Sequence, residues 1–292
     1  MRMAIFLGWR EFVVAFIVIA FASSLPNLFV GISSAMAKIP ELSFGDVAGN
    51  NLVALTIGIA LATFFTKKGI PADSRAIQTT AVFTMVSAIL PLVLVLDGNL
   101  SRIDGIILIG FFIFYLFWLF SKEERFTKVY DGHKSRPFKD FSNFMKDLLK
   151  VFLGIFFLIL SSQGIVKSSQ FFATAFNMSL ISIGVLITGA GSTLPEIYFA
   201  VASAKKGETW LILGDMMGAI IIPASLVLGI VALICPIQIS DFSPFAVARI
   251  FLVISALVFY FSVRSKHRIS KKEGLILLLI YIAFLFVENL IH

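Results

Sequence analysis

Two short stretches of the sequence decide the fold: "SSLPNLFVGISS" at residues 23–34 and "STLPEIYFAVAS" at residues 192–203. Each places a Leu-Pro pair inside a long apolar run, directly after two hydroxyl residues. A proline inside a helix cannot donate its backbone hydrogen bond and obstructs the preceding turn. We therefore predict two membrane helices that break at Pro26 and Pro195, where freed carbonyl groups lie beside hydroxyl side chains.

The composition places the chain in a bilayer. Of its 292 residues, 59% are hydrophobic, above the share of about 45 to 50% that is usual for soluble domains. The single cysteine cannot form an intramolecular disulfide, and the three histidines do not have metal-ligand spacing. Because no histidine lies in a predicted span, an intramembrane enzyme is also disfavoured. We predict neither enzymatic activity nor a cofactor.

Nine apolar segments are long enough, at about 20 residues each, to cross the hydrocarbon core. They are residues 11–37, 43–65, 77–96, 103–120, 147–165, 171–204, 210–234, 244–263 and 273–291. An odd number of spans puts the two termini on opposite sides of the membrane. The long polar segment 121–146 divides the chain into 1–120 and 147–292, and its mixed charge is typical of a solvated connector.

The basic residues set the orientation. With a cytoplasmic N-terminus, 20 of the 24 Lys and Arg residues fall on the inner side, including all eight between Lys122 and Lys150. Cytoplasmic loops carry an excess of Lys and Arg. We therefore predict a multi-pass protein of the plasma (cell) membrane with its C-terminus outside. The net charge of +7 then reflects membrane topology and lipid contact, and we predict no nucleic-acid partner.

The two halves contain a repeat. A shift of 169 positions aligns the Leu-Pro pairs and gives nine identities in the 29 positions from Ser23 to Asn51. In the predicted topology the first copy runs outward and the second inward, so the repeats are inverted. Inverted repeats with proline-interrupted helices at matching places are typical of secondary transporters with a site near the midplane.

The quoted motifs resemble a known family. "GAGSTLPEIYFAVASAKKGETWLILGDMMG" (189–218) resembles the second alpha-repeat of the sodium/calcium exchanger (cation/Ca2+ antiporter) superfamily, and "ASSLPNLFVGISSAMAKIPELSFGDVAGNN" (22–51) resembles the first. The resemblance implies an all-α integral membrane protein with the inverted-repeat exchanger fold. Similar exchangers have ten helices. Here the first motif begins close to residue 1, so we expect about nine, four in the first repeat and five in the second.

The resemblance also implies a site. Family members carry a glutamate after each Leu-Pro pair, hydroxyls before it, and an acidic or amide residue about 27 positions later. In this chain the second glutamate is kept, but asparagine replaces the first, and Ala54 and Pro223 occupy the later positions. The predicted ion-binding residues are Ser23, Ser24, Asn27, Asn50, Ser192, Thr193 and Glu196.

This mapping leaves Glu196 as the one carboxylate at the centre. Calcium usually takes six to eight oxygens, and its affinity rises with the charge of the ligands. One glutamate suits a single monovalent cation or a proton better. Ca2+, Na+ and H+ are the candidate transported ions.

Two aspartates remain outside this mapping. Asp46 and Asp215 replace an asparagine of the family and follow a glycine at the predicted start of a helix. Eight residues, or about 12 Å of helical rise, separate each from the site position after it. Each aspartate can cap its helix or serve as a vestibule carboxylate, outer for Asp46 and inner for Asp215.

Two functions follow from the sequence. The first is a secondary cation antiporter with inorganic cations and membrane lipids as its partners. The alternative is a degenerate homologue that does not transport and acts as a binding or scaffold protein, as suggested by Asn27, Ala54 and Pro223. Nothing in the sequence indicates an oligomeric state.

The topology has a direct test. In intact cells, a cysteine introduced into the 121–146 loop is expected to react only with membrane-permeant reagents, and a tag after His292 is expected to be accessible from outside. A reactive loop together with a protected tag would contradict the predicted orientation, because it would reverse the distribution of basic charge.

Overall fold

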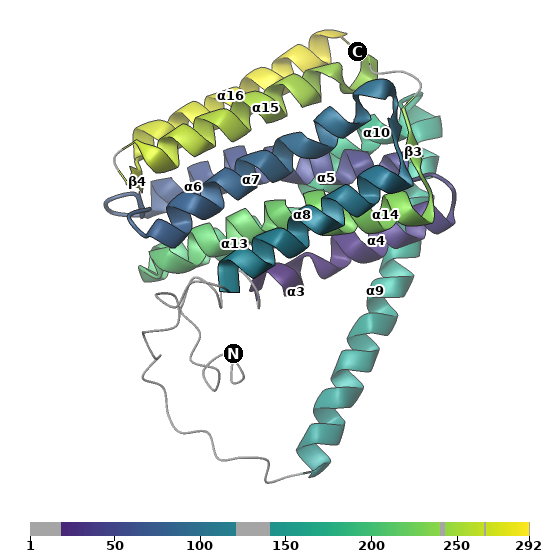
Figure 1. Ribbon diagram of the computed structural model, residues 1–292, viewed down its shortest axis with the longest axis horizontal. Coiled ribbons are helices and arrows are strands. Elements are labelled where there is room, and N and C mark those ends of the chain that lie inside the picture. The colour runs from purple at the N-terminus through teal and green to yellow at the C-terminus, as the bar shows by residue number, and fades with distance from the viewer. Residues whose placement is uncertain (1–18, 121–140, 240–242, 266, 292) are drawn as a thin grey trace.

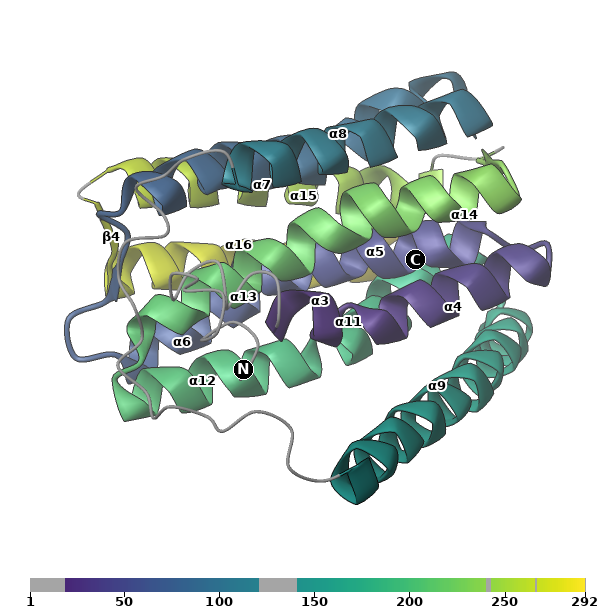
Figure 2. The same cartoon turned by 60° about the horizontal axis from the view of Figure 1, so that its bottom comes forward.

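The structure is a computed structural model that describes residues 19–120, 141–239, 243–265 and 267–291. Its helices lie side by side in one bundle, from which the long helix α9 extends (Figures 1 and 2). The first half contains α3 (Phe21–Ser23), α4 (Leu25–Met36), α5 (Glu41–Val53), η2 (Ala54–Gly58), α6 (Ile59–Phe65), β1 (Ile70–Pro71), α7 (Arg75–Leu94), η3 (Val95–Asp97), β2 (Asn99–Leu100) and α8 (Arg102–Phe120). The second half contains α9 (Phe141–Phe176), α10 (Leu180–Ile183), η5 (Gly184–Thr188), α11 (Gly189–Ser192), α12 (Leu194–Lys206), α13 (Thr209–Ile221), η6 (Ile222–Val227), α14 (Leu228–Ile234), β3 (Ile237–Gln238), α15 (Ser243–Arg264), β4 (Arg268–Ile269) and α16 (Lys271–Ile291).

Eight described helical segments are long and apolar enough to cross a membrane: Glu41–Phe65, Arg75–Asp97, Arg102–Phe120, Leu153–Phe176, Leu180–Lys206, Thr209–Ile234, Phe245–Arg264 and Lys271–Leu290. The broken segment α3–α4 is the described part of the predicted first span. The beginning of that span and residues 121–140 of the predicted loop lie outside the described residues. The predicted fold class, an all-α membrane protein with about nine spans, is confirmed.

The predicted boundary between the fifth and sixth spans is wrong. Residues 161–170 are polar enough to suggest the end of a helix, but α9 continues to Phe176 and also includes residues 141–146 of the predicted loop. Polar side chains do not break a helix when they find partners. The hydroxyl of Ser162 lies 2.8 Å from that of Ser33 on α4. The break comes at Asn177, whose positive φ of 54° is typical of a helix terminus.

Two short β ladders connect the halves. β1 pairs with β4, and β2 pairs with β3, in both cases antiparallel. A shift of 169 positions maps β2 onto β4, and it maps β1 onto residues 239–240, directly after β3 in the sequence. The repeat shift therefore maps each ladder onto the other. They lie at opposite ends of the bundle (Figure 1). This is the arrangement that inverted repeats produce.

The two central helices share an irregularity. α5 and α13 each run for 13 residues and then continue as π-helices, η2 and η6, before α6 and α14. Ala54 begins η2, and Pro223, its equivalent under the repeat shift, is the second residue of η6. In the spans Glu41–Phe65 and Thr209–Ile234, 83% and 78% of the apolar stretch is buried, against at most 44% in the other described spans. These two spans therefore form the centre of the bundle. Short π-helical turns inside helices often mark functional sites.

Glycines let the two repeats approach closely. A Cβ atom on Gly49 of α5 would overlap the backbone of Val185 in η5. Gly45 lies in the same way against Ile181, and Gly189 against the backbone of Asp46. Small residues at such contacts allow helix backbones to meet, and van der Waals packing of this kind drives helix association in lipid.

This contact predicts the effect of a single methyl group. Gly49→Ala is expected to lower the free energy of unfolding by about 1 to 3 kcal/mol through overpacking, measured by thermal unfolding of the purified protein in detergent. The control is Gly110→Ala in α8, where nothing lies within 4 Å of the added atom. The control should be neutral or stabilising, since alanine favours helix over glycine. Equal stability of the two variants would contradict the close contact.

Candidate functional site

Both Leu-Pro helices are interrupted at the residue before leucine. Ser24 separates α3 from α4, and Thr193 separates α11 from α12, with ψ angles of −8° and −12°, against about −42° in a regular helix. The prolines then fall in the first turn of α4 and of α12, where no backbone donor is needed. The two breaks are equivalent under the repeat shift.

The hydroxyls beside the breaks bond back to their own helices. Ser24 donates to the carbonyl of Ala20 at 2.7 Å, and Thr193 donates to that of Gly189 at 2.6 Å. Ser23 donates to Ala20 at 3.1 Å. The protons of Ser23 and Ser24 are thus used within their own helix, and that of Thr193 is shared between Gly189 and Asn50, while the oxygen lone pairs can still accept a proton or coordinate a cation.

Asn50 bridges the repeats. Its Nδ2 donates to the carbonyl of Ala219 at 2.8 Å, and its Oδ1 accepts a bond of 2.9 Å from the Thr193 hydroxyl. Ala219 is the equivalent of Asn50 under the repeat shift, so this bond lies where the two repeats meet. The side chain is completely buried. In this conformation Asn50 joins the repeats through both ends of its amide.

Asp46 does not cap a helix. α5 begins at Glu41 after Pro40, which leaves Asp46 in the second turn. The aspartate is 2% exposed, its Oδ1 lies 3.4 Å from the Ser192 hydroxyl, and Thr188 is its other hydroxyl neighbour. The expectation of a cap was wrong because Gly45 serves close packing and does not begin the helix.

Asp215 also lies inside its helix. α13 begins at Thr209 after Glu208, and Asp215 is 1% exposed. Neither of its carboxylate oxygens has a hydrogen-bond partner in the part of the chain that the structure describes. Its charged neighbour is Glu196. The capping expectation fails here too, and neither aspartate faces an open vestibule in this conformation.

Glu196 is positioned by the break that precedes it. It is the third residue of α12, is 2% exposed and faces the Ser23 hydroxyl of the other repeat. Its Oε2 has no hydrogen-bond partner among the described residues, and neither does the Oδ1 of buried Asn27. Asp46 and Asp215 are its charged neighbours. Glu196 therefore interacts electrostatically with two further buried carboxylates, one from each repeat.

The three carboxylates are neighbours in pairs. In the described ranges, no three side chains of Asp, Glu, His or Cys converge closely enough to hold one metal ion together. Glu196 is the member common to both pairs, since it is the charged neighbour of each aspartate.

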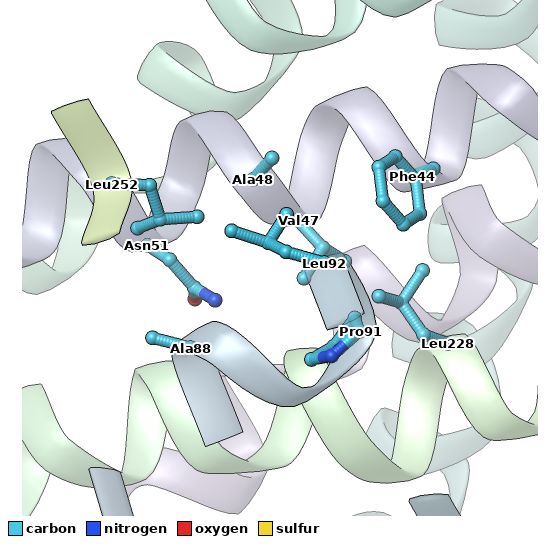
Figure 3. A pocket seen from close by; sticks show the side chains of 9 residues that line it. All are labelled: Phe44, Val47, Ala48, Asn51, Ala88, Pro91, Leu92, Leu228 and Leu252. Atoms are coloured by element: carbon cyan, nitrogen blue, oxygen red, sulfur yellow. The ribbon is translucent and has the colours of Figure 1, made fainter. Parts of the chain in front are cut away.

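Asn51 lies outside this group. It lines a small, mostly apolar pocket between α5 and α7, beside Ala88 and Pro91 (Figure 3). Its Oδ1 is buried and has no hydrogen-bond partner within the described segments. Of the two adjacent asparagines, only Asn50 takes part in the junction.

The family model described as "Sodium/calcium exchanger protein" matches residues 2–121 and 147–288, nearly the whole chain. The chain belongs to the sodium/calcium exchanger family. Members of this family are transporters and not enzymes, and the chain is a multi-pass integral membrane protein. The gap between the two matched segments, residues 122–146, coincides with the polar stretch that separates the halves in the sequence.

Three known proteins are similar to this chain over most of their length. The sodium/calcium exchanger MaX1 of Methanosarcina acetivorans is 23% identical, over 96% of this chain and 89% of that protein. The putative antiporter CaxA of Alkalimonas amylolytica is 24% identical, over 93% of this chain and 86% of its own length. The inner membrane protein YrbG of Escherichia coli is 25% identical, over 85% and 76%.

The fold is also that of a solved exchanger. A structure of the sodium-calcium exchanger NCX_Mj, soaked with 2.5 mM Na+ and 0.1 mM Ca2+, superposes with a TM-score of 0.69 at 22% sequence identity. The match covers 97% of this chain and 89% of that one. The exchanger fold expected from the two motifs is confirmed.

The junction predicts different roles for two adjacent asparagines. Asn50→Leu is expected to lower the free energy of unfolding by about 1 to 3 kcal/mol, because it removes a buried amide that joins the repeats. Asn51→Leu is the matched control and should be neutral or stabilising, because it removes a buried oxygen without a partner. Thermal unfolding in detergent measures both, and a control that is destabilised as much as Asn50→Leu would refute the bridge.

Proposed function

We propose that this chain is a secondary cation antiporter that works by alternating access around a site built on Glu196. One observation supports it most: the Glu196 carboxylate is 2% exposed, has an oxygen without a partner and faces a hydroxyl of the opposite repeat. A buried carboxylate must be neutralised by a cation or a proton. Glu196 is therefore suited to bind the two in alternation.

The helix break supplies the remaining chemistry. The Ser23 hydroxyl faces Glu196, and the hydroxyls of Ser24, Ser192 and Thr193 lie three or four positions before Asn27 or Glu196 in the sequence. The breaks disturb the backbone hydrogen bonding around them. Such oxygens can replace part of the hydration shell of a cation. Binding of a monovalent cation to a deprotonated Glu196, and its release on protonation, would exchange one positive charge for another without net charge movement at this residue.

Alternating access requires that the site open to one side at a time. The inverted repeats provide two such arrangements, because motion of one repeat against the other around their junction can expose Glu196 to either face. The names of MaX1, as a sodium/calcium exchanger, and CaxA, as a putative antiporter, support this assignment. Ca2+, Na+ and H+ are the candidate ions, driven by gradients without a cofactor, across the plasma membrane with the N-terminus inside.

A second function is favoured by a different observation. The positions at which the family carries its downstream acidic or amide residues are Ala54 and Pro223, both buried in π-helices at the centre of the bundle. A chain that has lost these groups can retain the fold as a binding or scaffold protein without transport.

Ion flux separates the two functions. The full-length protein in proteoliposomes is to be tested with gradients of Ca2+, Na+, K+, Mn2+ and H+, in pairs and singly. Exchange of one cation against another supports the antiporter. Absence of flux for every pair, with the protein correctly folded and inserted, favours the second function.

Glu196→Gln is expected to abolish flux, because it removes the charge that alternates between cation and proton while it keeps the shape of the side chain. The matched control is Glu208→Gln, at an exposed position before α13, which should transport at the parent rate. Size-exclusion chromatography shows whether both variants fold. Undiminished flux in folded Glu196→Gln would falsify a site built on this residue.

A further inference from the structure

The carboxylates beside Glu196 have no assigned function in a site built on that residue alone. Asp46 on α5 and Asp215 on α13 each lie eight residues before Ala54 and Pro223 on the same continuous helical spans. We infer that Asp46 and Asp215 are cation ligands, each forming with Glu196 one of two neighbouring binding positions. This inference rests on the proposed function, since it names further ligands of the same site.

The first position lies between Asp46 and Glu196. Asp46 is held beside the break of the other repeat by the close contact of its backbone with Gly189. Its Oδ1 lies 3.4 Å from the Ser192 hydroxyl, a long contact that leaves room for a shorter bond to a cation. Oxygens from Asp46, Ser192 and Glu196 thus come from both repeats.

The second position lies between Asp215 and Glu196. The helices that carry them pack side by side, and the neighbouring side chains Met216 and Ile197 both approach Gly58 of η2. Both oxygens of Asp215 and the Oε2 of Glu196 are buried without hydrogen-bond partners in the described part of the chain. A carboxylate pair buried in this way is stable only with a proton or a cation between its members.

The repeat shift adds one more oxygen to the second position. It carries the neighbouring pair Asp46 and Glu196 onto Asp215 and Asn27. By this symmetry Asn27 is expected to lie toward Asp215, and its Oδ1 is indeed buried and without a partner among the described residues. Carboxylate and amide oxygens together are the ligands that hard cations prefer.

The charges require a bound cation or proton. Asp46, Glu196 and Asp215 are buried, while the buried residues of the described segments include no Lys, Arg or His. Two carboxylates can neutralise one divalent ion, or one monovalent ion together with a proton. The loss of acidic or amide groups at Ala54 and Pro223 is therefore compensated two turns earlier on the same helices.

Equilibrium dialysis with radioactive Ca2+ and Na+ tests the assignment on the full-length protein in detergent. Asp215→Asn and Asp46→Asn keep the shape of the side chain, and each is expected to weaken binding of the ion that the parent binds by about tenfold or more, since affinity rises with ligand charge. Asp73→Asn, on the exposed loop before α7, is the matched control and should bind like the parent.

Thermal unfolding distinguishes a ligand from a structural residue. Without added cation, Asp215→Asn is expected to be as stable as the parent or more stable, because it removes an unpaired buried charge. The stabilisation that saturating cation gives the parent should be lost or strongly reduced in this variant. An Asp215→Asn protein that unfolds early without cation but binds with parent affinity would show that the residue is structural and would overturn the inference.

Flux in proteoliposomes separates this inference from the proposed function. If the parent exchanges cations and both aspartate variants bind within twofold of it, the antiporter remains and the ligand assignment is wrong. If the parent carries no flux but binding depends on Asp46 and Asp215, the assignment holds and the antiporter proposal fails. A parent that binds neither Ca2+ nor Na+ would also overturn the assignment.

Discussion

The contact between the glycine face of α5 and the backbone of residues 181–189 determines the rest of the structure. In lipid there is no water to drive helices together, so close backbone packing and buried hydrogen bonds must hold the repeats to each other. Gly45 and Gly49 provide that packing. Because the backbones touch, the side chains between them, Asp46 and Asn50, reach the hydroxyls of Ser192 and Thr193. The same contact that holds the repeats together therefore assembles the candidate site.

Most of the fold could be predicted from the sequence, because the membrane leaves few alternatives. Apolar runs of sufficient length must be helices, and the repeated Leu-Pro motifs indicate both the breaks and the internal duplication. The prediction failed where helix length depends on tertiary partners. Nothing in the polar run around Ser162 shows that its hydroxyl meets Ser33 of α4, so the end of α9 could not be located from polarity alone.

The candidate site was only partly predictable for a related reason. Mapping by family positions identifies which residue stands where a ligand stood, but it does not show which part of a helix lies opposite the break in the other repeat. A 13-residue helix such as α5 is about 20 Å long. Asp46 lies inside α5 and Ala54 begins η2, so the two residues lie at different depths along the span Glu41–Phe65. The sequence thus pointed to Glu196 and to the loss at Ala54 and Pro223, whereas the proximity of Asp46 and Asp215 to Glu196 needed the three-dimensional packing.

The bond between Asn50 and Ala219 has a consequence for the transport cycle. If the two repeats were identical, exchanging their conformations would convert an inward-open protein into an outward-open one of equal free energy. At the point where equivalent residues meet, this chain has an amide on one side and a methyl group on the other, and the amide donates in one direction only. The exchange therefore does not reproduce the same contact, and in the proposed alternating-access cycle this bond would contribute differently to the free energies of the two open forms.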